Sequence, residues 1–243
     1  MVMIPKIVHQ TAKSKDLTWE ERMLTRRIAK LLPGWSVRLW DDHDNLHLMK
    51  QHFPHYAERY EAISRGVMKA DIARLVYMHA FGGFYMDTDY KLLKPFSEKL
   101  LAQRCIFGVE AGQISIAHGA YSYDTAFKFG NAFFGASRGH PFFEAMIDDI
   151  FRRLPSDSMS DFELMSISGP HGLTSFFKSN YERFPGIHFE DQMVFFPPAQ
   201  AAGLKHMRDR STVGIHLCWG SWRTKRQWTT LKNRARRVVS ALV

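Results

Sequence analysis

The segment AFGGFYMDTDY, residues 80–90, places Asp87 and Asp89 directly after an apolar run. Buried carboxylates are costly unless a cation or hydrogen-bond donors balance them. Side chains two residues apart on a strand point to the same side, so a strand through this segment would direct both carboxylates toward one spot. Ligands of open α/β sheets bind at the carboxyl ends of strands. Hard oxygen ligands suit Mg²⁺ or Mn²⁺, which predicts a cation bridging to diphosphate oxygens. The alternative is a solvated acidic turn.

A second pair of charged residues precedes this segment. Asp71 and Arg74 are three residues apart in a helical pattern over residues 67–81, so they share one face of that helix. Their neighbours Ala70, Ile72 and Ala73 are apolar. The pair is therefore either an ordinary intrahelical ion pair or a pair that reaches into a functional site.

The elements that must position these residues alternate between strand and helix. Thr18 and Glu21 have the spacing of a capping box at the start of a helix that runs to about Leu32. Asp44 is expected to cap another helix, and Gly82-Gly83 to end the helix that carries Asp71. Strands are expected at residues 4–10, 35–40 and 84–90, with a further helical piece at 56–63. This order predicts an α/β fold with a mainly parallel sheet.

The second half of the chain gives weaker signals. Strands are expected at residues 105–110 and 131–136, and an amphipathic helix at 141–154. A loop follows at 155–161, and a turn-rich loop at 168–174 leads into a short helix. Residues 188–198 and 213–222 are expected to be strands or loops. The simplest division is one domain over residues 1–222 and a C-terminal tail over residues 223–243.

Composition excludes several classes of protein. The 243 residues are 45% hydrophobic and 14% aromatic, enough for a sizeable core, which excludes a disordered chain. Cys105 and Cys218 are the two cysteines, and their separation suggests neither a disulfide framework nor a zinc site. Lys6 and His9 come too early for a signal-peptide apolar region, and no run is long enough to span a membrane. We expect a cytoplasmic protein.

The net charge of +9 is concentrated at the C-terminus, because no acidic residue follows Asp209. From Trp228 onward, apolar residues recur on one helical face and basic residues fall mostly on the other. This pattern predicts either a terminal helix packed on the core or a helix that lies on an anionic membrane surface. In the second case the protein would be peripheral on the inner face of the cytoplasmic membrane.

The segment ADIARLVYMHAFGGFYMDTDY resembles the signature of the DXD-containing glycosyltransferases of family 32, which include initiating α-1,6-mannosyltransferases and bacterial capsule and lipopolysaccharide transferases. Three further segments agree in order along the chain: IPKIVHQ at 4–10, SGPHGLT at 168–174 and HLCWGSW at 216–222. The chain departs from the family where Thr11-Ala12 follows the opening His-Gln, a place often held by tryptophan. The resemblance implies a GT-A fold, a mixed and mostly parallel sheet flanked by helices that binds a nucleotide-sugar.

The resemblance also implies roles for individual residues. Asp89 would bind Mn²⁺ or Mg²⁺ directly, and His216 is a second candidate metal ligand. Catalytic roles fall to Asp87, Asp89 and Arg74. The residues expected to contact the UDP- or GDP-sugar donor are His9, Gln10, Asp71, Arg74, Asp87, Asn131, Ser221 and Trp222.

Simpler explanations exist for some of these residues. His9, His216 and Trp222 could each be a core residue, and Pro170-His171-Gly172 could be only a turn.

The function implied is a metal-dependent, retaining glycosyltransferase that moves a hexosyl or N-acetylhexosaminyl group to a glycan or lipid-linked acceptor, in surface polysaccharide or lipopolysaccharide synthesis. Because no carboxylate is identified as a nucleophile, we expect a front-side substitution assisted by the leaving phosphate. Two alternatives are a basic nucleic-acid-binding protein, which would leave the acidic segment unexplained, and a DxD phosphatase, which is disfavoured by Lys91 two residues after Asp89. A degenerate transferase that binds donor without turnover is a third. We expect no nucleic-acid partner.

Overall fold

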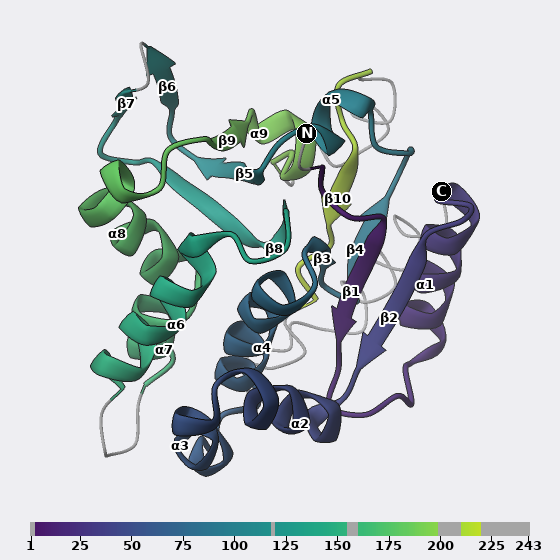
Figure 1. The fold of residues 1–243 in the computed structure, drawn as a ribbon. Coiled ribbons are helices and arrows are strands. Elements are labelled where there is room, and N and C mark those ends of the chain that lie inside the picture. The colour runs from purple at the N-terminus through teal and green to yellow at the C-terminus, as the bar shows by residue number, and fades with distance from the viewer. Residues whose placement is uncertain (1–2, 118–119, 155–159, 199–209, 220–243) are drawn as a thin grey trace.

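The computed structural model describes residues 3–117, 120–154, 160–198 and 210–219, and its centre is a six-stranded mixed sheet (Figure 1). The strand order is β2-β1-β3-β8-β5-β9. These strands are β1 (Ile7–Thr11), β2 (Ser36–Trp40), β3 (Gly83–Met86), β5 (Cys105–Ala111), β8 (Lys128–Ala136) and β9 (Ile187–Glu190). β8 runs antiparallel to β3 and β5, and the other neighbours pair in parallel. The start of β8 therefore lies at the edge where β1, β3 and β5 end.

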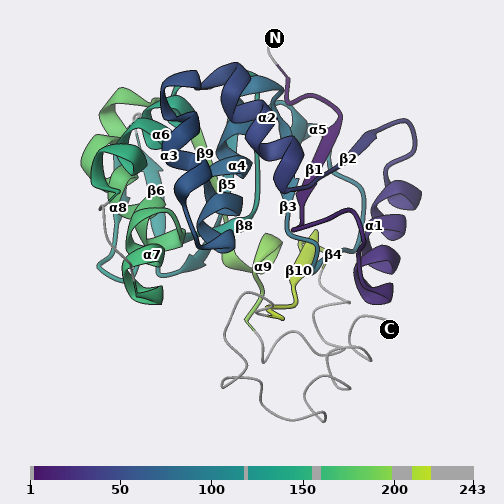
Figure 2. The same cartoon turned by 90° about the horizontal axis from the view of Figure 1, so that it is seen from below.

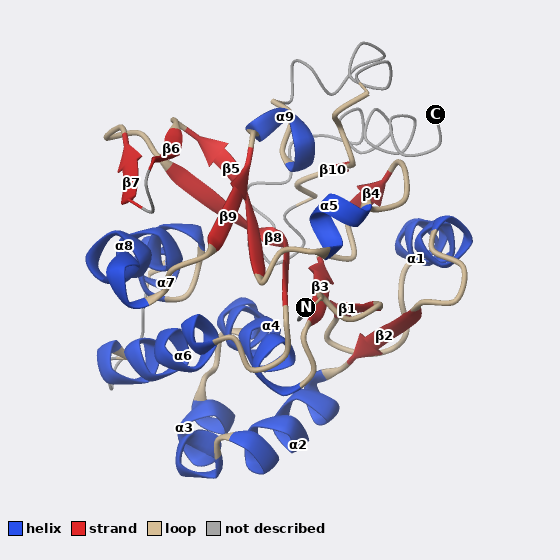
Figure 3. Cartoon of the chain, turned by 45° about the horizontal axis from the view of Figure 1, so that its top comes forward, coloured by secondary structure: helices blue, strands red, loops and turns tan. Residues whose placement is uncertain are grey.

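Helices cover both faces of the sheet, as the three views show (Figures 1–3). Successive strand residues alternate between the two faces. Phe84 and Phe133 pack with residues of α1, α5 and α9, whereas Tyr85 and Phe134 pack in the larger core with α2, α4, α6 and α8. The helices of the first face are α1 (Trp19–Leu31), α5 (Glu98–Leu101) and α9 (Gln192–Phe195). The remaining helices are α2 (Asp42–His52), α3 (Ala57–Ala62), α4 (Gly66–Ala80), α6 (Pro141–Arg153), α7 (Asp161–Ile167) and α8 (Pro170–Asn180).

Two short ribbons of strands complete the described fold. β4 (Tyr90–Leu92) pairs antiparallel with β10 (Gly214–His216), and β6 (Ile114–Ala117) forms a hairpin with β7 (Ala120–Tyr123). The hairpin projects from the upper left of the sheet in Figure 1. The β4–β10 ribbon joins the end of the described chain to the segment that follows β3.

Local signals in the sequence explain where several elements begin and end. Thr18 caps α1 in a reciprocal capping box with Glu21, as predicted. α4 ends before Gly82 and Gly83, whose φ angles are 65° and 106°. A Cβ on Gly82 would lie 2.4 Å from the backbone nitrogen of Arg138, and one on Gly83 would lie 2.6 Å from the carbonyl oxygen of Ile7. Only glycine satisfies both the left-handed conformation and this close approach.

Other predictions about the elements were wrong. Asp41, not Asp44, is the N-cap of α2, and Asp44 is its partner in the capping box. The segment at 168–174 is mostly helical rather than a turn-rich loop, because Pro170 occupies the first position of α8, where its missing N–H costs nothing. Short elements such as α5, α7 and the β6–β7 hairpin were not predicted.

Two further predictions concern the chain as a whole. Cys105 is buried, Cys218 is exposed, and both are free thiols. Over the described ranges, the structure holds no helix with the length and apolarity that crossing a membrane requires. The tail at 223–243 lies outside the described residues, so the domain division and the amphipathic helix stay predictions.

Candidate functional site

Asp87 and Asp89 lie in a tight turn between β3 and β4. β3 ends at Met86, and the backbone N–H of Tyr90 donates a 3.0 Å hydrogen bond to the carbonyl oxygen of Asp87. The N–H of Asp87 donates to the carbonyl oxygen of Ala132 on β8, at 2.9 Å. The strand runs into an acidic loop, as expected, but the expectation that strand alternation directs both carboxylates to one side was wrong. The turn, rather than strand alternation, brings their carboxylates to the same place.

His216 joins these two carboxylates. It is the last residue of β10 and pairs with Tyr90 across the β4–β10 ribbon, which lies beside α9 in Figure 2. Its Nε2 lies 3.2 Å from Oδ1 of Asp89 and 3.6 Å from Oδ2 of Asp87. One ligand atom from each residue lies within 4.8 Å of the others. Two carboxylate oxygens and one imidazole nitrogen are a set that a divalent cation such as Mn²⁺ can bind.

The charges in this group depend on one another. Burial lowers the pKa of His216, but its hydrogen bonds to Asp89 and Cys218 outweigh burial and raise the pKa well above the ordinary value. Burial raises the pKa of Asp89, but the hydrogen bond from His216 and that from the Trp219 backbone lower it overall. The Trp219 N–H lies 2.7 Å from Oδ2 of Asp89. Both shifts favour an ion pair between the His216 imidazole and the Asp89 carboxylate.

Asp71 on α4 forms a buried network next to this group. Its Oδ1 accepts a 2.9 Å hydrogen bond from the side-chain amide of Asn131, and its Oδ2 accepts a 3.0 Å bond from the hydroxyl of Ser168. Arg74 lies 3.3 Å from Oδ1. Burial raises the pKa of Asp71 to about 6, and the charge of Arg74 opposes this shift. Asp71 is thus held by three partners that come from three different parts of the chain.

Arg74 connects the network to the aspartate turn. Its Nη1 lies 3.3 Å from Oδ1 of Asp87 and donates a 2.7 Å bond to the carbonyl oxygen of Asn131. The guanidinium also lies 4.5 Å from the ring centre of Tyr85, whose hydroxyl donates a 2.5 Å bond to Asp87. Burial lowers the pKa of Arg74, but Asp87, Tyr85 and Asp71 raise it above the ordinary value. Arg74 thus forms the intrahelical ion pair with Asp71 and also contacts the aspartate turn.

All of these polar side chains except Ser168 line one cavity of about 780 Å³. The β1–α1 loop lines it with Lys13 and Asp16, and the start of α4 lines it with Arg65 and Lys69. The end of β5, the first half of β8 and the start of α8 also contribute. A cavity of this volume is in the range that holds cofactors and other drug-sized ligands.

His9 and Gln10 do not line this cavity. His9 is fully buried, its Nε2 is hydrogen-bonded to the carbonyl oxygen of Gly82 at 2.9 Å, and its ring stacks with Trp40. Burial lowers its pKa to about 4, so the ring is neutral at pH 7. Gln10 donates to the carbonyl oxygen of Asp87 and accepts from Thr25. The prediction that these two residues contact the donor is therefore corrected. His9 is a core residue, and Gln10 holds the Asp87 turn.

Two predicted residues, Ser221 and Trp222, lie outside the described residues. Sequence reasoning also missed three residues of the site: Tyr85, Ser168 and the backbone of Trp219. Ser168 and Trp219 belong to segments that had been singled out as motifs, so their neighbourhood, though not their contacts, was visible in the sequence. Tyr85 likewise belongs to a segment singled out as a motif, two residues before Asp87.

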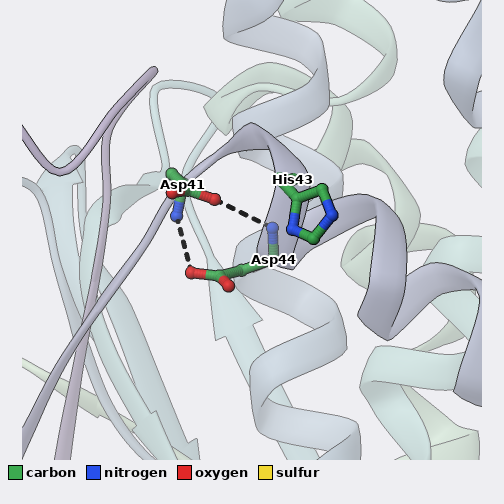
Figure 4. A group of neighbouring side chains, drawn as sticks. All are labelled: Asp41, His43 and Asp44. Carbon is green, nitrogen blue, oxygen red and sulfur yellow. Dashed lines mark hydrogen bonds between the residues drawn. The ribbon is translucent and has the colours of Figure 1, made fainter.

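A second group with metal-ligand chemistry consists of Asp41, His43 and Asp44 at the start of α2 (Figure 4). Here the Asp41 carboxylate accepts from the N–H of Asp44 at 2.9 Å, and the Asp44 carboxylate accepts from the N–H of Asp41 at 3.2 Å. Lys15 lies 2.9 Å from Asp44. His43 is exposed. These contacts are those of a helix cap, so the group needs no metal to explain it.

Comparison with known proteins points to one family. Residues 19–107 match the family model described as "Glycosyltransferase sugar-binding region containing DXD motif". That range includes both the Asp71–Arg74 pair and the aspartate turn. In this range the chain is similar to the DXD-containing glycosyltransferases. Mannosyl phosphorylinositol ceramide synthase SUR1 of Saccharomyces cerevisiae is 29% identical over 87 residues, which are 36% of this chain and 23% of the relative.

Two longer matches extend this finding. Inositol phosphoceramide mannosyltransferase 2 of Schizosaccharomyces pombe is 23% identical over 74% of this chain and 48% of its own length. These matches span about a quarter to a half of the two relatives. The solved structure of the PaToxG glycosyltransferase is similar with a TM-score of 0.51 and 18% identity, over 74% of this chain and 70% of that one. The fold is the predicted GT-A fold, an α/β sheet flanked by helices.

Proposed function

We propose that this chain is a metal-dependent, retaining glycosyltransferase that moves a sugar from a nucleotide-sugar to a hydroxyl of a glycan or lipid-linked acceptor. The observation that carries the proposal is the convergence of Asp87, Asp89 and His216 at a cavity that Asp71, Arg74 and Asn131 also line. The match of residues 19–107 to the DXD glycosyltransferase model favours this reaction over a DxD phosphatase or a nucleic-acid-binding protein.

In this proposal, Asp87, Asp89 and His216 hold a divalent cation. The imidazole nitrogen makes Mn²⁺ a better fit than Mg²⁺, which prefers oxygen ligands. When bound, the cation would neutralise charge that develops on the departing diphosphate. Lys13, Arg65 and Lys69 line the same cavity, as do Asp16, Glu21 and Asp42, and in this proposal the three basic side chains would pair with the nucleotide phosphates.

Asp71, Arg74 and Asn131 would bind and orient the donor sugar in this proposal. Their mutual contacts fix them before any ligand arrives, so little side-chain entropy is lost on binding. Retention would follow a front-side substitution. The bond from the anomeric carbon to the diphosphate breaks, the bond to the acceptor oxygen forms on the same face, and the acceptor proton passes to a phosphate oxygen of the leaving group. One relative is named as the synthase of a mannosyl compound and another as a mannosyltransferase. We therefore add GDP-mannose to the UDP-sugars as a candidate donor.

Thermal unfolding with a panel of nucleotide-sugars tests the proposal. We expect UDP-glucose, UDP-N-acetylglucosamine or GDP-mannose to raise the melting temperature in the presence of Mn²⁺, since a ligand that binds the folded state stabilises it. Asp89→Ala should abolish the Mn²⁺-dependent part of the increase. Asp148→Ala removes an exposed carboxylate on α6 outside the cavity and should leave it intact. An unchanged response in Asp89→Ala would overturn the proposed metal site.

A further inference from the structure

Thr88 is the residue between the two aspartates of the turn, and its side chain contacts α1. The carboxylates of Asp87 and Asp89 approach His216, whereas the hydroxyl of Thr88 donates a 2.8 Å hydrogen bond to Oε1 of Glu21. Thr88 and Glu21 are 67 residues apart in the chain. The bond between them therefore connects the tip of the aspartate turn to the first turn of a distant helix.

Glu21 uses its two carboxylate oxygens for two different contacts. Oε2 accepts a 2.8 Å hydrogen bond from the backbone N–H of Thr18, which is one half of the capping box of α1. Oε1 accepts the bond from Thr88. A capping box requires only the first of these contacts. The start of the helix therefore does not explain why Glu21 also binds Thr88.

A second connection runs from α1 to the same turn through Gln10. Thr25 lies four residues after Glu21 and donates a 2.8 Å hydrogen bond to Oε1 of Gln10. Nε2 of Gln10 in turn donates to the carbonyl oxygen of Asp87 at 3.3 Å. Residues four apart on a helix share a face. One face of α1 is thus linked to the aspartate turn at two places.

The helix that makes these contacts is itself packed against the sheet. Leu24 and Ile28 of α1 are buried, and Ile28 belongs to the same core cluster as Phe84 of β3. Nε of Arg27 donates a 2.6 Å hydrogen bond to the carbonyl oxygen of Leu92, the last residue of β4. α1 is therefore a fixed support for the turn that β3 and β4 flank.

The aspartate turn needs such support because it lies outside the strands. β3 ends at Met86 and β4 begins at Tyr90, so the two carboxylates are carried by a loop of three residues. Residues that orient metal ligands without touching the metal commonly change its affinity by about 10- to 100-fold. A side chain that holds the tip of this loop is placed to have such an effect.

We propose that Glu21 is a positioning residue for the proposed metal site. Through Thr88 it holds the turn in the geometry that brings Asp87 and Asp89 to His216. The same carboxylate fixes the start of α1, so one side chain secures both the aspartate turn and the end of the β1–α1 loop, which also lines the cavity. This inference rests on the proposed function and adds to it a residue that acts through Thr88.

Amide hydrogen exchange without metal tests the Glu21–Thr88 bond directly. The amides of Tyr90 and Leu217 donate to the carbonyl oxygens of Asp87 and Asp89, so their exchange rates report opening of the turn. Thr88→Val keeps the shape of the side chain and removes the hydroxyl. We expect it to speed exchange at the turn about tenfold relative to the amides of β8, because a hydrogen bond to a charged acceptor is lost. Thr88→Ser, which keeps the hydroxyl, should restore slow exchange.

Thr18→Val is the matched control, because Thr18 is the other threonine bonded to Glu21. This change removes the hydroxyl that accepts from the N–H of Glu21, so it weakens the cap of α1. It should leave the bond from Thr88 in place. Exchange at the turn, relative to the amides of β8, should therefore stay within about twofold of the unaltered protein.

Mn²⁺ titration followed by electron paramagnetic resonance tests the consequence for the metal ligands. Thr88→Val and Glu21→Ala should each weaken Mn²⁺ binding about tenfold, because a residue that orients the ligands is lost. The double variant should bind no more weakly than the weaker single variant, since both changes remove the same bond. Thr18→Val should bind Mn²⁺ as the unaltered protein does.

Three results would overturn the positioning role of Glu21. In the first, Thr88→Val changes exchange or Mn²⁺ binding no more than Thr18→Val does. In the second, Thr88→Ser fails to restore them. In the third, the losses of Glu21→Ala and Thr88→Val add in full in the double variant. Failure of the proposed function has a different signature: the unaltered protein then binds no Mn²⁺ with UDP or GDP, and the exchange rates alone decide whether Glu21 holds the turn.

Discussion

The two groups of aspartates and histidine have almost the same chemistry but different surroundings. At the start of α2, Asp41 and Asp44 accept hydrogen bonds from each other's backbone, and an exposed lysine completes the group. At the cavity, the carboxylates of Asp87 and Asp89 each keep one oxygen directed toward His216. The comparison teaches that the type and proximity of ligand atoms do not define a metal site. What differs is the source of the partners: backbone N–H groups at the start of α2, and side chains of other segments, such as Arg74 and His216, at the cavity.

The largest expected difference between the groups concerns the basic side chain that pairs with the carboxylates of each. It is Arg74 at the cavity and Lys15 at the start of α2. Arg74→Met should lower the free energy of unfolding by about 3–5 kcal/mol, because Asp71 and Asp87 would lose a buried partner. Lys15→Met should leave it nearly unchanged, since the Lys15 side chain is 58% exposed. Urea unfolding without metal measures both values. Equal losses would show that the two groups are electrostatically alike.

The second difference concerns metal affinity. His216→Asn should weaken Mn²⁺ binding at least about tenfold, because one of three ligand atoms is removed. His43→Asn should leave it unchanged, since the adjacent carboxylates are engaged in the helix cap. Electron paramagnetic resonance of free Mn²⁺, with and without UDP or GDP, measures the affinity. A loss caused by His43→Asn would place a metal at the start of α2.

The smallest expected effect concerns pH. Partial burial raises the pKa of Asp44, but hydrogen bonds from Lys15 and the Asp41 backbone outweigh it and lower the pKa in the folded state. Because the pKa of Asp44 is lowered in the folded state, its carboxylate stabilises the fold at pH values above the ordinary carboxyl pKa near 4. This stabilisation is lost as the pH falls through the lower pKa of the folded state. Asp44→Asn should therefore cost roughly 0.5–1 kcal/mol at pH 7.

The cost of Asp44→Asn should shrink as the pH falls through the lowered pKa of Asp44 in the folded state. Denaturant unfolding at pH 7 and pH 3 compares the variant with the unaltered protein. Mn²⁺ binding at pH 7 serves as the control and should not change. A deficit that grows on acidification would contradict the assignment of this group as a helix cap.

The sequence predicted the parts of the site that are close together in the chain. Asp71, Arg74 and the aspartate turn lie within 19 residues, on a helix and strand whose junction is marked by Gly82-Gly83. The GT-A fold was predicted through the family motifs and the alternation of strands and helices. In these parts of the chain, the local sequence pattern and the tertiary packing favour the same helix, turn and strand.

Contacts between distant segments could not be predicted. His9 was expected at the donor, but a strand-end position does not reveal that Trp40 and Tyr77 stack on its ring. Ser168 and Glu21 reach the site only through the packing of α8 and α1. The roles of Ser221 and Trp222, the basic tail and the cellular location stay predictions.

The antiparallel position of β8 has a consequence for the order in which the chain is synthesised. β3 and the aspartate turn leave the ribosome long before residues 128–136, which pair with them, and longer still before His216. Until β8 arrives, β3 has one unpaired edge, a surface to which other strands can add. Asp71 and Arg74 also lack their Asn131 partner during this interval. A newly made chain therefore passes through a stage with an open sheet and an incomplete site, and premature termination before residue 128 would make that stage permanent.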